Sequence, residues 1–188
     1  MAPVLCMLAT VTGWPAESTW GVADLMRGLK TIQSSRARFS ERKELAILGK
    51  PLELSGTLIY RAPGRLEKHT VAPQREILIV DQDELVLESP ELGGKKSFGL
   101  HDHPVLWALV ESIRSTLAGD LATLKRFYDV QFHGGESSWH LTLTPRQSDM
   151  KAVVDEILID GSGTSISRIE IRENGGDRSV MTIVREGT

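Results

Sequence analysis

The sequence is poor in the residues on which several protein classes depend. Only one cysteine is present, Cys6, which excludes a disulfide framework within the chain, a zinc ribbon and a dithiol redox pair. The 22 basic residues do not outnumber the 25 acidic ones, so the chain lacks the basic excess that nucleic-acid-binding domains usually carry. No phosphate-binding loop or dinucleotide-binding glycine pattern occurs. The composition therefore argues against nucleic acid and nucleotides as ligands.

Long apolar runs are also missing, except near the N-terminus. The run from Pro3 to Trp14 holds no charged residue, and the first basic residue of the chain is Arg27. About 12 apolar residues are too few to span a bilayer but match the core of a secretory signal. We therefore predict that residues 1–16 are a signal peptide, which lacks its basic leader because the chain is clipped or its start codon is misplaced. Ala16 and Ala23 mark two candidate cleavage points, and a buried N-terminal segment is the alternative.

Residues 17–188 have the size and composition of one soluble globular domain. A chain of 188 residues is too short for two full domains, but it buries roughly 70% of its unfolded surface when it folds. Apolar residues make up 40% and charged residues 25%, which fits a folded protein and argues against disorder.

Helical periodicity occurs in three places. Ser18 is a good N-cap for a first, short helix, and Pro104 suits the first position of a second helix. Gly119 ends the second helix, and Asp120 caps a third, short one. The predicted apolar positions are Leu25, Leu29 and Ile32 in the first helix, and Leu106, Leu109, Ile113 and Leu117 in the second.

Much of the remaining sequence alternates between apolar and polar residues, as strands with one buried face do. Turn signals at Pro63-Gly64, Asp160–Gly163 and Asn174–Asp177 join strands tightly, which makes neighbouring strands antiparallel. About six strands precede the second helix and about five follow the third. These patterns predict an α+β fold, in which a large curved antiparallel sheet has helices packed on one side.

One local cluster, His101-Asp102-His103, carries groups that catalysis or a divalent metal would need. Side chains two residues apart converge only in an extended segment, so we interpret the cluster as a polar turn that precedes the helix at Pro104. There is no Gly-x-Ser-x-Gly elbow to present a nucleophile. We predict no catalytic residue, no metal ligand and no cofactor. A hydrolase or metal-dependent enzyme that uses this segment is the alternative.

Large apolar side chains recur on the inferred inner faces of the strands and helices. We predict that they line a hydrophobic cavity, which would bind acyl chains by burying their surface, although an ordinary closed core is the alternative. The helix from Pro104 to Leu117 is expected to act as a lid that presents Trp107 or its apolar stripe to the cargo. The predicted ligand-binding residues are Phe39, Leu58, Tyr60, Leu66, Trp107, Leu109, Ile113, Trp139 and Leu141.

Several motifs in order resemble those of the periplasmic outer-membrane lipoprotein carriers, the LolA-like proteins. The similar segments are Leu25 to Leu29, Ala37 to Glu41, Gly56 to Leu66, Gly119 to Pro145 and Ile169 to Asp177. The resemblance implies an unclosed β-barrel with helices as a lid over a hydrophobic cavity. It also places an arginine that latches the lid directly before a proline, where this chain has Ala62. Whether Arg61 or Arg65 replaces that arginine stays open.

What the resemblance implies about function is transport. A monomeric periplasmic carrier would take an acylated lipoprotein or a similar amphiphile from an inner-membrane exporter and deliver it to an outer-membrane acceptor. It would act as a chaperone in outer-membrane biogenesis, without catalysis and without nucleic acid. The sequence does not distinguish a lipoprotein cargo from another amphiphile. A structural envelope protein that binds no lipid is a further alternative.

Overall fold

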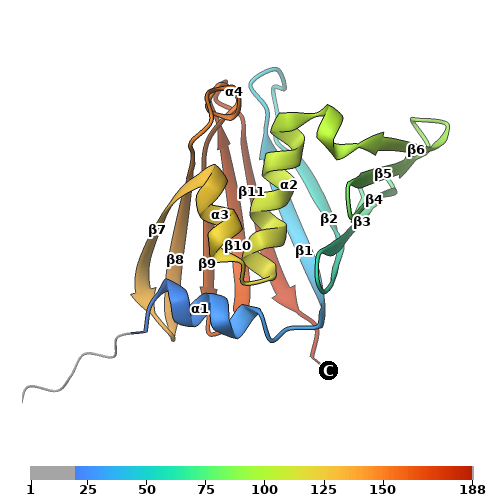
Figure 1. Cartoon of the computed structure of the whole chain (residues 1–188). Helices are drawn as coiled ribbons and strands as arrows, with labels where there is room; N and C mark the ends of the chain where they lie inside the picture. Colours follow the sequence, from blue (N-terminus) through green and yellow to red (C-terminus); the bar gives the residue numbers. More distant parts are fainter. Residues whose placement is uncertain (1–19, 188) are drawn as a thin grey trace, which may run out of the picture.

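The fold is an open antiparallel sheet with helices on one face (Figure 1). The computed structural model describes residues 20–187, so the predicted signal peptide, Cys6 and Ser18 lie outside the described residues. The strands are β1 (Ser34–Glu44), β2 (Leu52–Arg61), β3 (Arg65–Ala72), β4 (Glu76–Asp81), β5 (Glu84–Ser89), β6 (Gly94–Gly99), β7 (Tyr128–Gly135), β8 (Ser138–Pro145), β9 (Val154–Ser162), β10 (Ser165–Glu173) and β11 (Arg178–Arg185). All eleven lie in one sheet, in the order β6-β5-β4-β3-β2-β1-β11-β10-β9-β8-β7. Because the edge strands β6 and β7 do not pair, the sheet is not closed into a barrel, as predicted.

The helices are α1 (Val22–Leu29), the short 3-10 helix η1 (Leu100–Asp102), α2 (Pro104–Leu117), α3 (Leu121–Phe127) and α4 (Ser148–Lys151). Pro104, Gly119 and Asp120 act as predicted: Gly119 follows α2 with φ of +65°, and the Asp120 carboxylate accepts a hydrogen bond from the Thr123 N–H at 3.0 Å. The first helix begins later than predicted, because Asp24 bonds back to the Gly21 N–H at 3.0 Å and fixes Gly21 as its N-cap. None of the described helices is long and apolar enough to cross a membrane.

The register of the strands separates side chains onto two faces of the sheet. One row on the inner face crosses five neighbouring strands and consists of Phe132, Leu141, Ile159, Ile169 and Met181. Helices α1, α2 and α3 lie over this inner face in Figure 1. Because successive strand residues point to opposite sides, the residues between these positions face away from the helices.

Two separate hydrophobic cores hold the helices on the sheet. The larger core packs α1, α2 and α3 against the strands β7 to β9, with Leu25, Leu124, Trp139 and Leu141 among its buried members. The smaller core joins α2 and η1 to β4 and β5; its buried members are Val80, Leu85, Leu100 and Val110. The helices are therefore anchored at both ends of the sheet.

The outer face of the sheet carries a network of ion pairs around a nearly inaccessible carboxylate. Glu170 on β10 has an exposed fraction of 1%, and Arg168, Arg172 and Arg178 all contact its oxygens. The hydrogen bond from Arg178, together with that from Arg172 and the charges of Arg168 and Arg172, outweighs the opposing effect of burial. These contacts lower the pKa of Glu170 to about 2.

The lowered pKa of Glu170 predicts how stability depends on pH. A carboxylate whose pKa is about 2 when folded and 4.5 when unfolded stabilises the protein above pH 4.5, and this contribution falls as the pH drops towards 2. Glu170→Gln should remove that part of the acid sensitivity and cost on the order of 2 kcal/mol at neutral pH. Urea unfolding between pH 7 and 3 measures both effects. Glu53→Gln, at an exposed ion pair, is the matched control and should behave as the wild type. Equal pH profiles for all three proteins would contradict the assignment.

Candidate ligand-binding cavity

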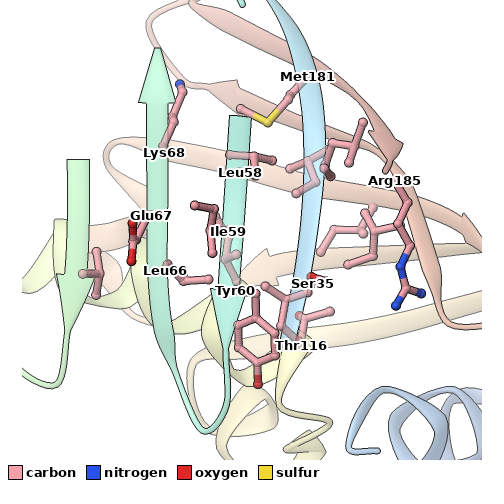
Figure 2. Close-up of a pocket in the computed structure, with 18 of the residues that line it drawn as sticks. Ser35, Leu58, Ile59, Tyr60, Leu66, Glu67, Lys68, Thr116, Met181 and Arg185 are labelled. Atoms are coloured by element: carbon pink, nitrogen blue, oxygen red, sulfur yellow. The ribbon is translucent and has the colours of Figure 1, made fainter. Parts of the chain in front are cut away.

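A cavity of about 240 Å³ lies between α2 and the inner face of the sheet (Figure 2). Its walls come from strands β1 to β4 and β9 to β11, from α2 and from Ile32. Most of the lining is aliphatic: Ile32, Ala37, Leu58, Ile59, Leu66, Leu78, Val80, Val110, Ile113, Leu117, Ile159, Ile166, Ile169, Ile171, Met181 and Ile183. An apolar space of this kind suits a hydrocarbon chain.

The sequence of α2 explains why the space between helix and sheet stays open. Val110, Ile113 and Leu117 are spaced to face the sheet together and line the cavity. The buried hydroxyls beside them bond within the helix: Ser112 to the Leu109 carbonyl and Thr116 to the Ser112 carbonyl, each at 2.7 Å. These short side chains fill little volume.

Four of the nine predicted ligand-binding residues line this cavity, namely Leu58, Tyr60, Leu66 and Ile113. The other five do not. Phe39 lies on the inner face of β1 and is buried, with the Lys68 Nζ 5.0 Å from its ring centroid. Leu109, Trp139 and Leu141 pack in or against the larger core, where Trp139 and Leu141 have exposed fractions of 2% and 0%.

Trp107 is part of the packing between the two cores and not of the cavity wall. Its ring meets Phe127 edge-on, with the centroids 4.8 Å apart, and the His101 ring lies 5.6 Å from it on another side. It also packs against both hydrophobic clusters. The residues of α2 that the cavity meets are Val110, Ile113, Thr116 and Leu117, on the C-terminal half of the helix.

A buried ion pair, which the sequence reasoning missed, interrupts the apolar wall. Glu41 on β1 has an exposed fraction of 4%, and its carboxylate accepts hydrogen bonds from Lys68 and, at 2.7 Å, from Ser179. Lys43 lies 3.5 Å from the same carboxylate. Burial acts to raise the pKa of Glu41, but the charge and hydrogen bond of Lys68, the hydrogen bond of Ser179 and the charge of Lys43 outweigh it and lower the pKa.

The two arginines near Ala62, Arg61 and Arg65, make no hydrogen bond or ion pair to a helix within residues 20–187. Arg61 and Arg65 both bond to Glu67, on the outer face of the sheet. A different arginine ties the helix to the sheet: Arg114 of α2 donates from Nη1 to the Gln82 carbonyl at 2.8 Å. Gly64 leaves space for this side chain, since a Cβ there would lie 2.9 Å from the Arg114 Nε.

The imidazoles of the His101-Asp102-His103 segment diverge. His101 points to Trp107 and pairs with Asp83 at 3.2 Å, whereas the His103 ring lies 6.3 Å from that of Phe98. His103 is the N-cap residue of α2, which fits the polar turn predicted there. Among residues 20–187 there is no group of three or more His, Cys, Asp or Glu side chains placed to hold a metal ion.

Together, the unclosed sheet, the covering helix and the apolar space between them define the architecture of a lipid-carrier domain. Over residues 16–185 the sequence matches the family described as outer membrane lipoprotein carrier protein LolA-like, and the chain belongs to this family.

Individual relatives are distant. The outer-membrane lipoprotein carrier protein of Pseudomonas putida strain GB-1 is 25% identical over 177 residues, covering 92% of this chain and 79% of that protein. Its counterpart in Pseudomonas entomophila strain L48 is 24% identical over 162 residues, covering 84% and 73%. The crystal structure of an uncharacterized conserved protein from Thermus thermophilus aligns with a TM-score of 0.52 at 8% identity, over 89% of this chain and 85% of that one. This last similarity concerns the fold alone.

The position of Trp107 can be tested by asking whether its side chain supports the core or contacts a ligand in the cavity. Trp107→Ala should lower the free energy of unfolding by about 3 kcal/mol, because the ring joins both cores, and should leave amphiphile binding by the folded protein unchanged. Ile113→Ala, one helical turn and a half further along α2, should cost less stability and change the binding. Urea unfolding and titration with a fluorescent amphiphile measure the two quantities. Weaker binding in folded Trp107→Ala than in Ile113→Ala would show that Trp107 contacts the cargo.

Proposed function

We propose that this protein is a non-enzymatic periplasmic carrier that encloses the acyl chain of a lipoprotein or similar amphiphile in its cavity. The observation that supports the proposal most directly is an apolar cavity beneath a helix in a sheet that is not closed. The carrier would collect its cargo at the inner membrane and release it at the outer membrane, working as a monomer. Membership of the lipoprotein carrier family supports the same reading.

The energy of binding would come from the lining. Each methylene group moved from water into an apolar site contributes roughly 0.8 kcal/mol, so a chain of several methylenes binds without any specific polar contact. Because this interaction is not directional, chains of different structure would be accepted. Native mass spectrometry of protein purified from the periplasm tests the proposal, and a bound acyl species is the expected result. Protein that is always empty and does not bind added amphiphiles would instead favour a structural envelope protein.

Filling the cavity provides a sharper test of where the chain binds. Ala37 lies on the inner face of β1 and lines the cavity, so Ala37→Trp should occupy the space and reduce amphiphile binding at least tenfold, which is about 1.4 kcal/mol. Val184 lies on the neighbouring strand β11, beside Arg38, and is 55% exposed. Val184→Trp therefore adds the same ring outside the cavity and should bind as the wild type. Melting temperatures confirm that both variants fold. Unchanged binding by folded Ala37→Trp would place the ligand elsewhere.

A second test concerns how the cavity opens. Exchange of cargo requires α2 to move away from the sheet, and the bond from Arg114 to the Gln82 carbonyl holds it there. Arg114→Ala should therefore speed amide hydrogen exchange in α2 and quicken amphiphile uptake and release. The loss of one charge-assisted hydrogen bond should cost about 1.5 kcal/mol of stability.

Arg61→Ala is the control for this variant. Arg61 flanks the latch position of the family but bonds to Glu67 on the outer face, where Arg65 and His69 also hold that carboxylate. Amide hydrogen exchange in α2 of the Arg61→Ala variant should be as fast as in the wild type. If Arg61→Ala releases α2 and Arg114→Ala does not, the latch is on the strand as in the family pattern. Uniformly faster exchange throughout Arg114→Ala would mean that Arg114 supports the whole fold and does not act as a latch.

A further inference from the structure

The cavity is apolar in its middle and polar at two ends. Along β11 its wall contains Ser179, Met181, Ile183 and Arg185. At the usual rise of a strand, Ser179 and Arg185 are roughly 20 Å apart. One monolayer of a bilayer has a hydrocarbon depth of about 15 Å, so the distance fits one extended acyl chain with room for its head group.

At the Ser179 end of the cavity the charged side chains are paired with one another. Glu41 there is bonded by Lys68 and Ser179 and lies near Lys43. A buried ion pair that is internally satisfied has no charge to offer a ligand, and separating it would leave a charge without a partner. The two lysines at this end are therefore already engaged by Glu41.

The Arg185 end differs, because its cation has no partner among residues 20–187. No Asp or Glu oxygen of the described chain lies within 4.0 Å of the Arg185 guanidinium. Arg185 is among the residues that line the cavity (Figure 2), and its cross-strand neighbour on β1 is Ala37. The carboxylate of the next residue, Glu186, is held by Arg36 at 3.0 Å and by Arg38 at 3.8 Å.

Two residues with hydroxyl groups, Tyr60 and Ser35, lie at the same end. Tyr60 lines the cavity with an exposed fraction of 3%, and its Oη makes no hydrogen bond to any described residue. Burial alone raises the pKa of Tyr60. Its cross-strand neighbour is Ser35, which also lines the cavity and lies diagonally across from Arg185. Both hydroxyls can donate a hydrogen bond to a ligand oxygen.

We propose that the Arg185 end of the cavity binds the anionic head group of an acyl-chain amphiphile, a carboxylate or a phosphate, with the Tyr60 and Ser35 hydroxyls as further donors. This inference rests on the proposed carrier function and narrows its ligand to anionic amphiphiles. A guanidinium offers paired N–H donors that match the oxygens of either anion. The acyl chain then runs along β11 and β1 towards Met181, over the aliphatic lining.

The experiment compares ligands that share one chain and differ only in the head group. Hexadecanoate, hexadecyl phosphate, hexadecanol and hexadecyltrimethylammonium compete against the uncharged fluorescent probe N-phenylnaphthylamine, below their micellar concentrations. The wild type should bind the two anions about tenfold more tightly than the alcohol, and the cation most weakly. Comparing carboxylate with phosphate identifies which anion the site prefers.

Arg185→Gln should lose this preference and bind all four ligands alike, with its affinity for hexadecanol unchanged. Tyr60→Phe keeps the ring and should lose about threefold in anion binding only, because it removes one donor. Arg38→Gln is the matched control, since Arg38 lies on the outer face of β1 with an exposed fraction of 72% and should not affect the preference.

The outcomes separate this inference from the carrier function. A wild type that binds the alcohol as tightly as the anions overturns the head-group site and leaves the carrier function standing. The same conclusion follows if Arg185→Gln keeps its preference for the anions. It also follows if Arg185→Gln loses affinity for hexadecanol as well, because Arg185 would then act through packing. A wild type that binds no amphiphile overturns both proposals together.

Discussion

A sheet of eleven strands with one apolar face presents more surface than its helices can cover, and the rest of the structure follows from this mismatch. At about 4.8 Å between strands, such a sheet is roughly 50 Å wide when flat. A helix with its side chains is about 10 to 12 Å across, so α1, α2 and α3 cover little more than half of that width. The sheet curls around α2, and two cores form where the helices meet strands. Between the two cores, side chains line the inner face of the sheet but do not fill the space beneath the helices.

The charged residues are distributed in accordance with this arrangement. On the outer face, which none of the described helices covers, the carboxylates of Glu67 and Glu170 are each bonded by two or more arginines, which keeps the strands paired and the face hydrated. On the inner face charges are few, and Glu41 and Lys68 neutralise each other. Arg185 has no carboxylate partner among the described residues, and it lies where the inner face meets solvent.

Alternation of apolar and polar residues predicts most strands of this fold, because nearly every strand has one face under the helices and one in water. It also places Leu58 and Tyr60 on the inner face. It does not predict which inner side chains meet a helix and which meet empty space, since that depends on the distance between layers. Trp139 points to the same face and yet lies in a closed core. Glu41 and Arg185 occupy inner-face positions of their strands by strict alternation. Because both are charged, the sequence alone suggests that they face outwards.

The corner between α2 and α3 has a consequence for the direction in which the domain can open. Gly119 lies so close to α1 that a Cβ would be 2.1 Å from the Met26 carbonyl oxygen, and its φ of +65° lies in the left-handed region that favours glycine. Helix α1 and the end of α2 are thus packed closely together, whereas the opposite flank of α2 is held to β4 and β5 by the smaller core and by the hydrogen bond of Arg114. A movement of α2 pivots at this closely packed corner and widens a gap on the side of β4 and β5. Cargo would then pass through one side entrance, and a docking partner would have to approach that flank.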